Sequence, residues 1–228
     1  MTTLAQRLAL LQNRIETSCA SNARALGDVQ LIGVSKFQAA QYVIEASKLG
    51  ITDFGENYLQ EALLKIDTIG DKKLTWHFIG SIQSNKTRVI AESFNWVHTV
   101  DRLKIAQRLS KQCPSNKELN VLLQVNIDND PNKGGVSSEA CADLVSQISK
   151  LPQLKLRGLM AILSQDTDPR VGYETVAQLH RELKETLSPE LRPNWDTLSM
   201  GMTQDLEQAI AAGATMIRVG TALFGPRE

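Results

Sequence analysis

The sequence predicts an α/β protein that forms one (β/α)8 barrel of the TIM type with an extra N-terminal helix. Short runs rich in β-branched residues alternate eight times with longer amphipathic runs. The chain has 228 residues, close to the size of one such barrel. No linker rich in Pro, Gly and Ser divides it, so residues 1–228 are expected to form a single domain. An open sheet with helices on both faces is the alternative.

The expected elements follow one another along the whole chain. Residues 1–20 are predicted to form an amphipathic helix, because Leu4, Leu8, Leu11 and Ile15 recur at helical spacing. The strands are predicted from short apolar or β-branched runs over residues 29–34, 52–54, 75–79, 96–100, 120–127, 155–162, 197–200 and 215–219. The helices are predicted from amphipathic runs over residues 39–49, 57–69, 85–93, 102–111, 138–150, 170–187 and 204–212. Each crossover helix returns the chain to the same end of the sheet, so the strands should be parallel.

Composition excludes several classes of protein. Lys and Arg number 25 and Asp and Glu also number 25, so the chain lacks the basic excess of a general nucleic-acid or anionic-membrane binder. No apolar stretch approaches the roughly 18 residues of a spanning helix. Polar residues interrupt the first helix, which argues against a signal peptide. We therefore expect a cytoplasmic protein that binds neither nucleic acid nor membrane.

The cysteines and histidines do not form a metal-binding pattern. Cys19, Cys113 and Cys141 are far apart and are expected to be neutral thiols in a reducing compartment. The three histidines of the sequence are scattered too, so no metal site is expected.

Barrel enzymes and binding proteins carry their sites at the carboxyl ends of the strands. The first predicted strand leads into Ser35 and Lys36, and Lys36 should point its amine towards the barrel mouth. A partly dry environment favours the neutral amine, which can attack a carbonyl group and form a Schiff base. The alternative is a solvated lysine on the rim.

The last two strands are followed by candidate phosphate-binding loops. Ser199-Met200-Gly201-Met202-Thr203 precedes a helix expected to begin at Gln204, and Gly220-Thr221 follows the eighth strand. Glycines allow close backbone approach, and free N–H groups at a helix start attract anions. The alternative is ordinary capping and turn formation by the same residues.

Arg218 lies between Ile217 and Val219 in the last strand and is expected to point into the barrel. A charge there needs a partner or a ligand, and an ion pair with Glu56 or Asp53 is the alternative to a ligand. A lysine, an inward arginine and a phosphate cradle together describe a site for a phosphorylated carbonyl compound. Pyridoxal 5′-phosphate has those features.

Several motifs occur in one order along the chain: Gly33-Val34-Ser35-Lys36, Phe54-Gly55-Glu56-Asn57-Tyr58, Trp76-His77-Phe78-Ile79-Gly80 with Gln83, Asn85 and Lys86, Leu198-Ser199-Met200-Gly201-Met202, and Ile217-Arg218-Val219-Gly220-Thr221. By these motifs the sequence resembles the pyridoxal phosphate homeostasis proteins, whose barrel is similar to the N-terminal domain of alanine racemase. The resemblance covers nearly the whole chain.

The resemblance implies a role for each matching residue. Lys36 would hold pyridoxal phosphate as an internal aldimine, and Arg218 would face the pyridine nitrogen. The phosphate would be bound by Ser199, Gly201, Gly220 and Thr221 with the backbones of Met200 and Met202. Asn57 and His77 would lie on the ring side of the pocket and Met160 would pack on the ring. For His77 the alternative is a core histidine with a backbone partner.

The resemblance also implies a cofactor carrier in vitamin B6 and amino- and keto-acid homeostasis rather than a dedicated enzyme. Alanine racemase-like enzymes add a second domain and a second acid/base, and neither is expected here, because the sequence ends at Glu228 after the last strand. We therefore expect a monomer. A weak racemase or decarboxylase is one alternative, and an aldolase-type barrel in which Lys36 attacks a sugar phosphate is another.

Overall fold

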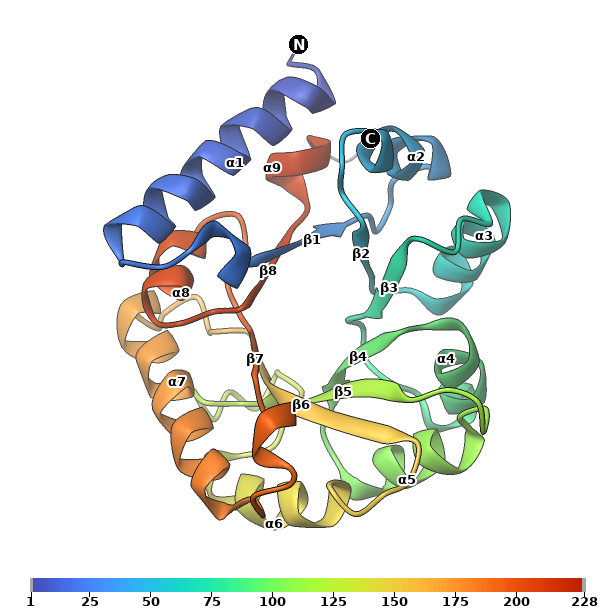
Figure 1. The fold of residues 1–228 in the computed structure, drawn as a ribbon, viewed down its shortest axis with the longest axis vertical. Coiled ribbons are helices and arrows are strands. Elements are labelled where there is room, and N and C mark those ends of the chain that lie inside the picture. Colours follow the sequence, from blue (N-terminus) through green and yellow to red (C-terminus); the bar gives the residue numbers. More distant parts are fainter. Residues whose placement is uncertain (1, 227–228) are drawn as a thin grey trace.

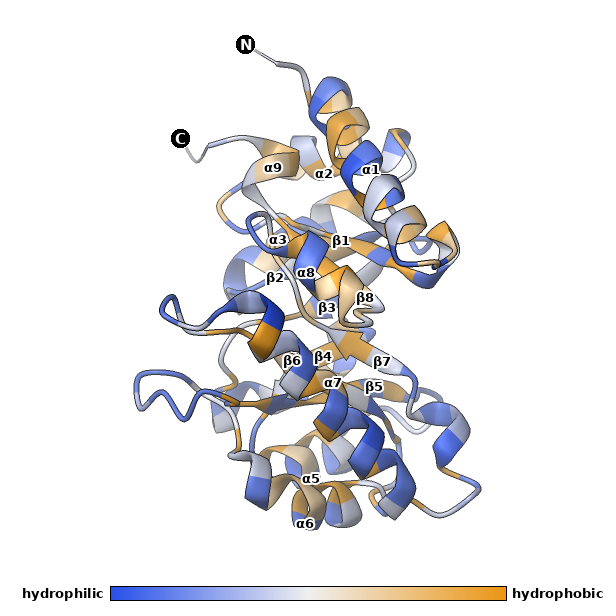
Figure 2. Cartoon of the chain, turned by 90° about the vertical axis from the view of Figure 1, so that its left-hand side faces the viewer, coloured by the Kyte–Doolittle hydropathy of each residue, from blue (hydrophilic) through white to orange (hydrophobic). Residues whose placement is uncertain are grey.

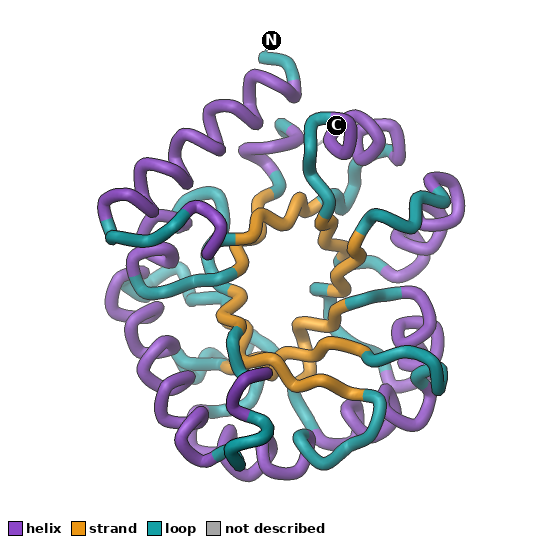
Figure 3. Tube along the Cα trace, in the orientation of Figure 1, coloured by secondary structure: helices purple, strands orange, loops and turns teal. Residues whose placement is uncertain are grey.

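The structure is a computed structural model that describes residues 2–226. Met1 of the predicted first helix and residues 227–228 of the predicted domain lie outside the described residues. The strands form a closed parallel barrel in the order β1 to β8, and β8 pairs back with β1 through Ile32 and Arg218 (Figure 3). The predicted (β/α)8 barrel is confirmed. The open sheet is wrong, because the pairing of β8 with β1 leaves no edge between these two strands.

The observed elements follow the predicted order. The strands are β1 (Gln30–Val34), β2 (Asp53–Glu56), β3 (Thr75–Phe78), β4 (Trp96–Val100), β5 (Leu119–Val125), β6 (Leu154–Ala161), β7 (Thr197–Ser199) and β8 (Met216–Val219). The helices are α1 (Leu4–Ser21), α2 (Ala40–Lys48), α3 (Leu59–Ile69), α4 (Thr87–Ser93), α5 (Leu103–Gln112), α6 (Ser138–Ile148), α7 (Pro169–Thr186), α8 (Leu206–Ala211) and α9 (Thr221–Phe224). The short helix α9 was not predicted, and α8 begins two residues later than expected.

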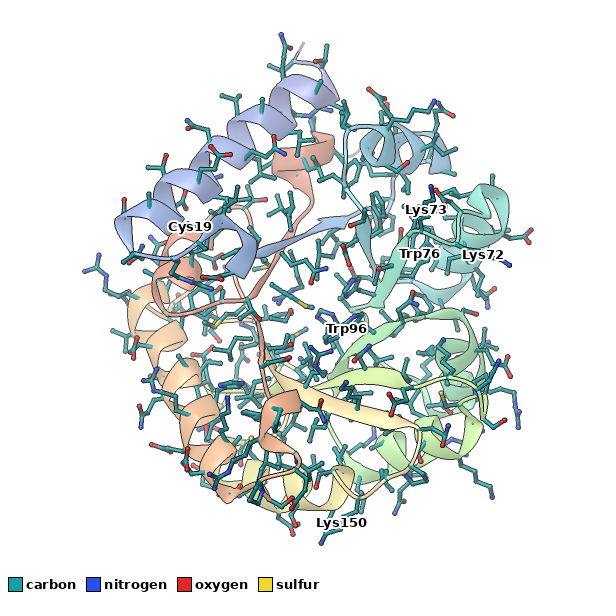
Figure 4. The ribbon with its side chains drawn as sticks, viewed as in Figure 1. Cys19, Lys72, Lys73, Trp76, Trp96 and Lys150 are labelled. Atoms are coloured by element: carbon teal, nitrogen blue, oxygen red, sulfur yellow. The ribbon has the colours of Figure 1, made fainter. Side chains whose placement is uncertain are left out.

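Apolar side chains form two cores. The larger core fills the space between the barrel and its helices. The smaller core lies inside the barrel and consists of Ile32, Trp96, Leu122, Met160 and Met216. Figure 4 places Trp96 near the middle of the ring of strands. The barrel interior is therefore packed, and its polar groups must find partners within it.

Helix α1 packs across α8 and α9, as Figure 1 shows. Its buried face contains the leucines and isoleucine of the predicted stripe, which confirms the amphipathic helix. The helix begins at Leu4 because Thr3 caps it and Gln6 completes a capping box. Arg7 donates to the main-chain oxygens of Leu223 and Phe224, so α1 fixes the end of α9.

The outer surface is dominated by the polar faces of the helices. Figure 2 shows hydrophobic colours along the strands and largely hydrophilic colours on α7. Among residues 2–226, no helix is long and apolar enough to cross a membrane. The three cysteines are buried and unpaired, and the described part of the chain contains no cluster of His, Cys, Asp and Glu that could hold a metal ion.

Candidate functional site

A cavity of about 390 Å³ opens at the carboxyl ends of the strands. Its volume falls in the usual range of small-molecule sites, roughly 300–1,000 Å³. It is lined by Val34, Lys36, Asn57, Ile79, Met160, Ile162, Met202, Thr203, Gln204, Asp205, Arg218, Gly220 and Thr221. The cavity therefore unites Lys36, Arg218 and Thr221, which lie far apart in the sequence.

The loop that carries Lys36 rests on a buried ion pair. Lys36 follows β1 and is half-buried. Its neighbour Ser35 donates a hydrogen bond to Glu56 Oε1 at 2.6 Å. Lys65 Nζ donates to Glu56 Oε1 at 2.7 Å and to the Ser35 main-chain oxygen at 2.6 Å. Burial raises the pKa of Glu56 above its ordinary value, against the opposing effect of Lys65 and Ser35.

The residue after Lys36 has a strained backbone. Phe37 has φ 63°, in the left-handed region that non-glycine residues seldom adopt. Its N–H donates to Glu61 Oε1 at 2.6 Å, and Lys65 Nζ donates to the same oxygen at 2.7 Å. Glu61 and Lys65 therefore hold both sides of the turn that presents Lys36 to the cavity.

Arg218 points into the barrel, as its position between two outward residues predicted. It is 4% exposed and donates from Nη1 to Ser199 Oγ at 2.7 Å and from Nη2 to the Ala161 main-chain oxygen at 2.9 Å. Burial lowers the pKa of Arg218. The expected alternative, an ion pair with Glu56 or Asp53, is wrong, because Glu56 binds Lys65 and Asp53 binds His77.

His77 lies in the barrel core and does not line the cavity. Its Nε2 is 2.9 Å from Asp53 Oδ1 and its Nδ1 is 2.9 Å from His98 Nε2. Burial lowers the pKa of His77. The core alternative describes this histidine better than a cofactor contact, although its partners are side chains rather than backbone groups. Sequence reasoning missed them because they come from two other strands, β2 and β4.

Three residues of the predicted phosphate loop also lie behind the cavity. Ser199 is fully buried, and its hydroxyl contacts Arg218 and His98. The Met200 N–H donates to the Met216 main-chain oxygen. Gly201 has φ +92°, and a Cβ there would lie 2.5 Å from Ala209 Cβ. These residues therefore pack the loop after β7 against the barrel and α8.

The predicted helix start after β7 differs from the structure. The Met202 N–H donates to Asp205 Oδ1 at 2.6 Å, so this group is not free for a phosphate. The Asp205 carboxylate also accepts from Tyr173 Oη at 2.8 Å, and α8 begins only at Leu206. The sequence signal for this turn was an aspartate placed three residues after Met202, a common turn arrangement.

Gly220 and Thr221 line the cavity on its other side. Thr221 opens α9, in which the Leu223 and Phe224 N–H groups donate to the Gly220 main-chain oxygen. Asn57 is a further polar residue of the lining. Its Nδ2 donates to the Ile79 main-chain oxygen at 3.5 Å, and its buried Oδ1 has no partner among the described residues. The cavity thus offers polar groups that a bound ligand can satisfy.

Comparisons with known proteins identify relatives of the chain. A family model described as "Alanine racemase, N-terminal domain" matches residues 12–228. The chain is 50% identical over 229 residues to the "Pyridoxal phosphate homeostasis protein" of Pseudomonas aeruginosa, covering 100% of this chain and 97% of the relative. The chain belongs to the pyridoxal phosphate homeostasis protein family. The resemblance stated from the motifs is confirmed.

Two further comparisons support the membership. The chain is 47% identical over 226 residues to the protein of the same name from Haemophilus influenzae, covering 97% of this chain and 94% of that relative. The solved structure of PipY from Synechococcus elongatus PCC7942 with PLP bound has a TM-score of 0.85 and 36% identity, covering 98% of this chain and 100% of that one.

Proposed function

We propose that the protein binds pyridoxal 5′-phosphate in the cavity at the carboxyl ends of the strands. It serves vitamin B6 and amino- and keto-acid homeostasis without a dedicated reaction of its own. The observation that carries this proposal is that one cavity joins Lys36, Arg218 and the Gly220–Thr221 loop. The PLP-bound structure of PipY, a relative with 36% identity, supports it.

The residues of the cavity fit the chemistry of this group. When bound, the cofactor supplies an aldehyde that reacts with primary amines. Lys36 would provide the primary amine that holds the aldehyde of the cofactor as a Schiff base. The ion pair behind Ser35 and the bond from Phe37 to Glu61 hold the lysine-bearing turn in place.

The other contacts orient the ligand. Arg218 would provide N–H groups to the pyridine nitrogen, and a guanidinium can only donate, which would favour an unprotonated ring nitrogen. The buried Met160 would pack against the ring, and the Asn57 amide would contribute a polar atom on the ring side. Backbone N–H groups at Gly220 and Thr221, with the Thr221 hydroxyl, would bind the phosphate.

The cellular setting is part of the proposal. The three buried, unpaired cysteines suit a reducing compartment, and we place the protein in the cytoplasm. We expect it to act as a monomer, which analytical ultracentrifugation tests directly.

A titration with pyridoxal phosphate tests the proposed binding. Purified cofactor-free protein should turn yellow, with saturable visible absorbance. The Lys36→Ala variant should not develop this absorbance, whereas the control Lys86→Ala should behave as the unmodified protein, because Lys86 does not line the cavity. Equal absorbance from Lys36→Ala and the unmodified protein would overturn the proposal.

A further inference from the structure

A chain of hydrogen bonds crosses the interior of the barrel and ends at Arg218. Asp53 Oδ1 is 2.9 Å from His77 Nε2, and His77 Nδ1 is 2.9 Å from His98 Nε2. His98 Nδ1 is 2.9 Å from Ser199 Oγ, which accepts from Arg218 Nη1 at 2.7 Å. Five different strands (β2, β3, β4, β7 and β8) contribute one residue each, and all five residues are buried.

The two ends of this chain fix the direction of every bond in it. Arg218 can only donate and the Asp53 carboxylate can only accept. Ser199 accepts from Arg218, which leaves its own hydroxyl proton for Nδ1 of His98. His98 then donates from Nε2 to Nδ1 of His77, and His77 donates from Nε2 to Asp53. With both histidines neutral, each ring carries its proton on Nε2, and each bond holds one proton.

The opposite order fails at the carboxylate end. If His98 donated from Nδ1 to Ser199, His77 would have to donate from Nδ1 to His98. The Nε2 of a neutral His77 would then be an acceptor that faces the Asp53 carboxylate, another acceptor. That contact requires a protonated Asp53. Burial raises the pKa of Asp53, but the lowering effects of His77, Thr52 and Gln30 together leave this pKa below its ordinary value.

The surroundings keep the two histidines neutral and in place. His77 stacks on Trp96, with ring centroids 5.7 Å apart and an interplanar angle of 15°. Both histidines are fully buried, and burial lowers the pKa of each. For His98 the positive charge of Arg218 also disfavours protonation. A second proton on His77 Nδ1 would face the Nε2 proton of His98 and break the bond between the two rings.

We propose that Asp53, His77, His98 and Ser199 form a positioning relay that holds the Arg218 guanidinium in one orientation at the cavity. With the Ala161 main-chain oxygen, the relay occupies one donor on each terminal nitrogen of the guanidinium. The remaining N–H groups are left for a ligand. The inference rests on the proposed function only in naming that ligand as the pyridine nitrogen of pyridoxal phosphate. Ser199 and His77 therefore act through Arg218 rather than by touching the cofactor.

The order of the protons is tested without the cofactor and without a variant. Heteronuclear NMR of the histidine ring nitrogens distinguishes the two neutral tautomers. In cofactor-free protein at neutral pH, we expect His77 and His98 each to carry a single proton, on Nε2, in slow exchange with water. A proton on Nδ1 of either ring, or two protons on one ring, would overturn the relay.

The coupling to the site is tested with a matched pair of variants. His98→Gln keeps an amide acceptor for Ser199 and a donor for His77, whereas His98→Leu keeps neither. We expect His98→Leu to weaken pyridoxal phosphate binding about tenfold or more and to shift the absorbance maximum of the bound cofactor. His98→Gln should restore both to within about threefold of the unmodified protein. His180→Leu, which removes a histidine from α7 outside the cavity, is the control.

The outcomes separate the two proposals. If the unmodified protein does not bind pyridoxal phosphate, the proposed function fails, and the tautomers still decide the relay. The unmodified protein could bind pyridoxal phosphate while His98→Leu, His98→Gln and His180→Leu all bind it with the same affinity and the same absorbance spectrum. In that case the positioning relay is wrong, and the proposed function stands. If His98→Leu does not fold, Ser199→Ala replaces it, with the same expected loss of affinity and spectral shift.

Discussion

The Lys65 ammonium lies 2.7 Å from the Glu56 carboxylate, and these side chains are 5% and 0% exposed. The pair is buried directly behind the turn that carries Lys36, because Lys65 also binds the Ser35 main-chain oxygen. A buried ion pair gives little net stability, but removing one partner leaves an uncompensated charge. The pair therefore makes the position of the turn depend on both residues.

The substitution Lys65→Met should destabilise the protein by about 3 kcal/mol, because it leaves the Glu56 carboxylate buried without its partner. Adding Glu56→Gln should recover part of this loss, since the buried charge is then absent. Urea unfolding measures both changes. The exposed Lys72→Met is the control and should change the free energy of unfolding by less than about 0.5 kcal/mol. A loss of less than about 1 kcal/mol for Lys65→Met would be no larger than the effect of an ordinary substitution. It would contradict the role of Lys65 as the partner of the buried Glu56 carboxylate.

Gly80 determines where Asn57 lies at the cavity. A Cβ at Gly80 would lie 1.9 Å from the Asn57 main-chain oxygen, so Gly80→Ala must displace the backbone that carries Asn57. We expect Gly80→Ala to lower the free energy of unfolding by about 2–3 kcal/mol and to weaken pyridoxal phosphate binding. Gly27→Ala is the matched control, because a Cβ there has no atom within 4 Å. Equal stability and affinity in the two variants would show that the contact does not matter.

Arg218→Lys should weaken cofactor binding by about tenfold or more while the barrel stays folded. Lysine keeps the charge, but its single nitrogen cannot match the planar donors that contact Ser199 and Ala161. Equilibrium dialysis measures the affinity, and circular dichroism monitors the fold. The exposed Arg181→Lys on α7 should leave the affinity unchanged. An unchanged affinity for Arg218→Lys would show that the arginine side chain does not contribute to cofactor binding.

His180 should make stability depend on pH. Burial lowers the pKa of His180 to about 4 from the ordinary 6.5, and its Nε2 has no partner in the described part of the chain. Between these two values the unfolded chain binds a proton that the folded chain does not. The contribution of His180 to stability is thus complete above pH 6.5 and is lost as the pH falls towards 4.

The pH effect is measured as a difference between two proteins. From about pH 7.5 to about pH 5, the unmodified protein should lose about 1–2 kcal/mol more stability than His180→Phe, which retains a ring against Trp195 but cannot titrate. Urea unfolding at the two pH values gives the difference. Parallel losses in the two proteins would show that His180 titrates normally in the folded state.

The sequence predicted features that depend on local periodicity. The helical spacing of Leu4, Leu8 and Leu11 correctly identified the buried face of α1, and strand alternation correctly placed Arg218 inside the barrel. Lys36 and Thr221 could be expected at one cavity because parallel strands bring their carboxyl ends to one rim.

Contacts between distant side chains could not be predicted in the same way. His77 was expected at the cofactor, but its partners Asp53 and His98 lie on neighbouring strands whose register the sequence does not reveal. Helix α8 begins at Leu206 rather than at the predicted Gln204, after a turn in which the Met202 N–H donates to the Asp205 carboxylate. Such a single side-chain hydrogen bond leaves no periodic signal in the sequence. The four-residue helix α9 is too short for a periodic signal.

The covalent bond at Lys36 is tested most directly by borohydride reduction of the protein incubated with pyridoxal phosphate, followed by peptide mass analysis. We expect the peptide containing Lys36 to gain the mass of one reduced cofactor, and we expect Lys36→Ala to leave the protein without specific labelling. Reduction that labels other lysines to the same extent, with the Lys36 peptide unmodified, would contradict it.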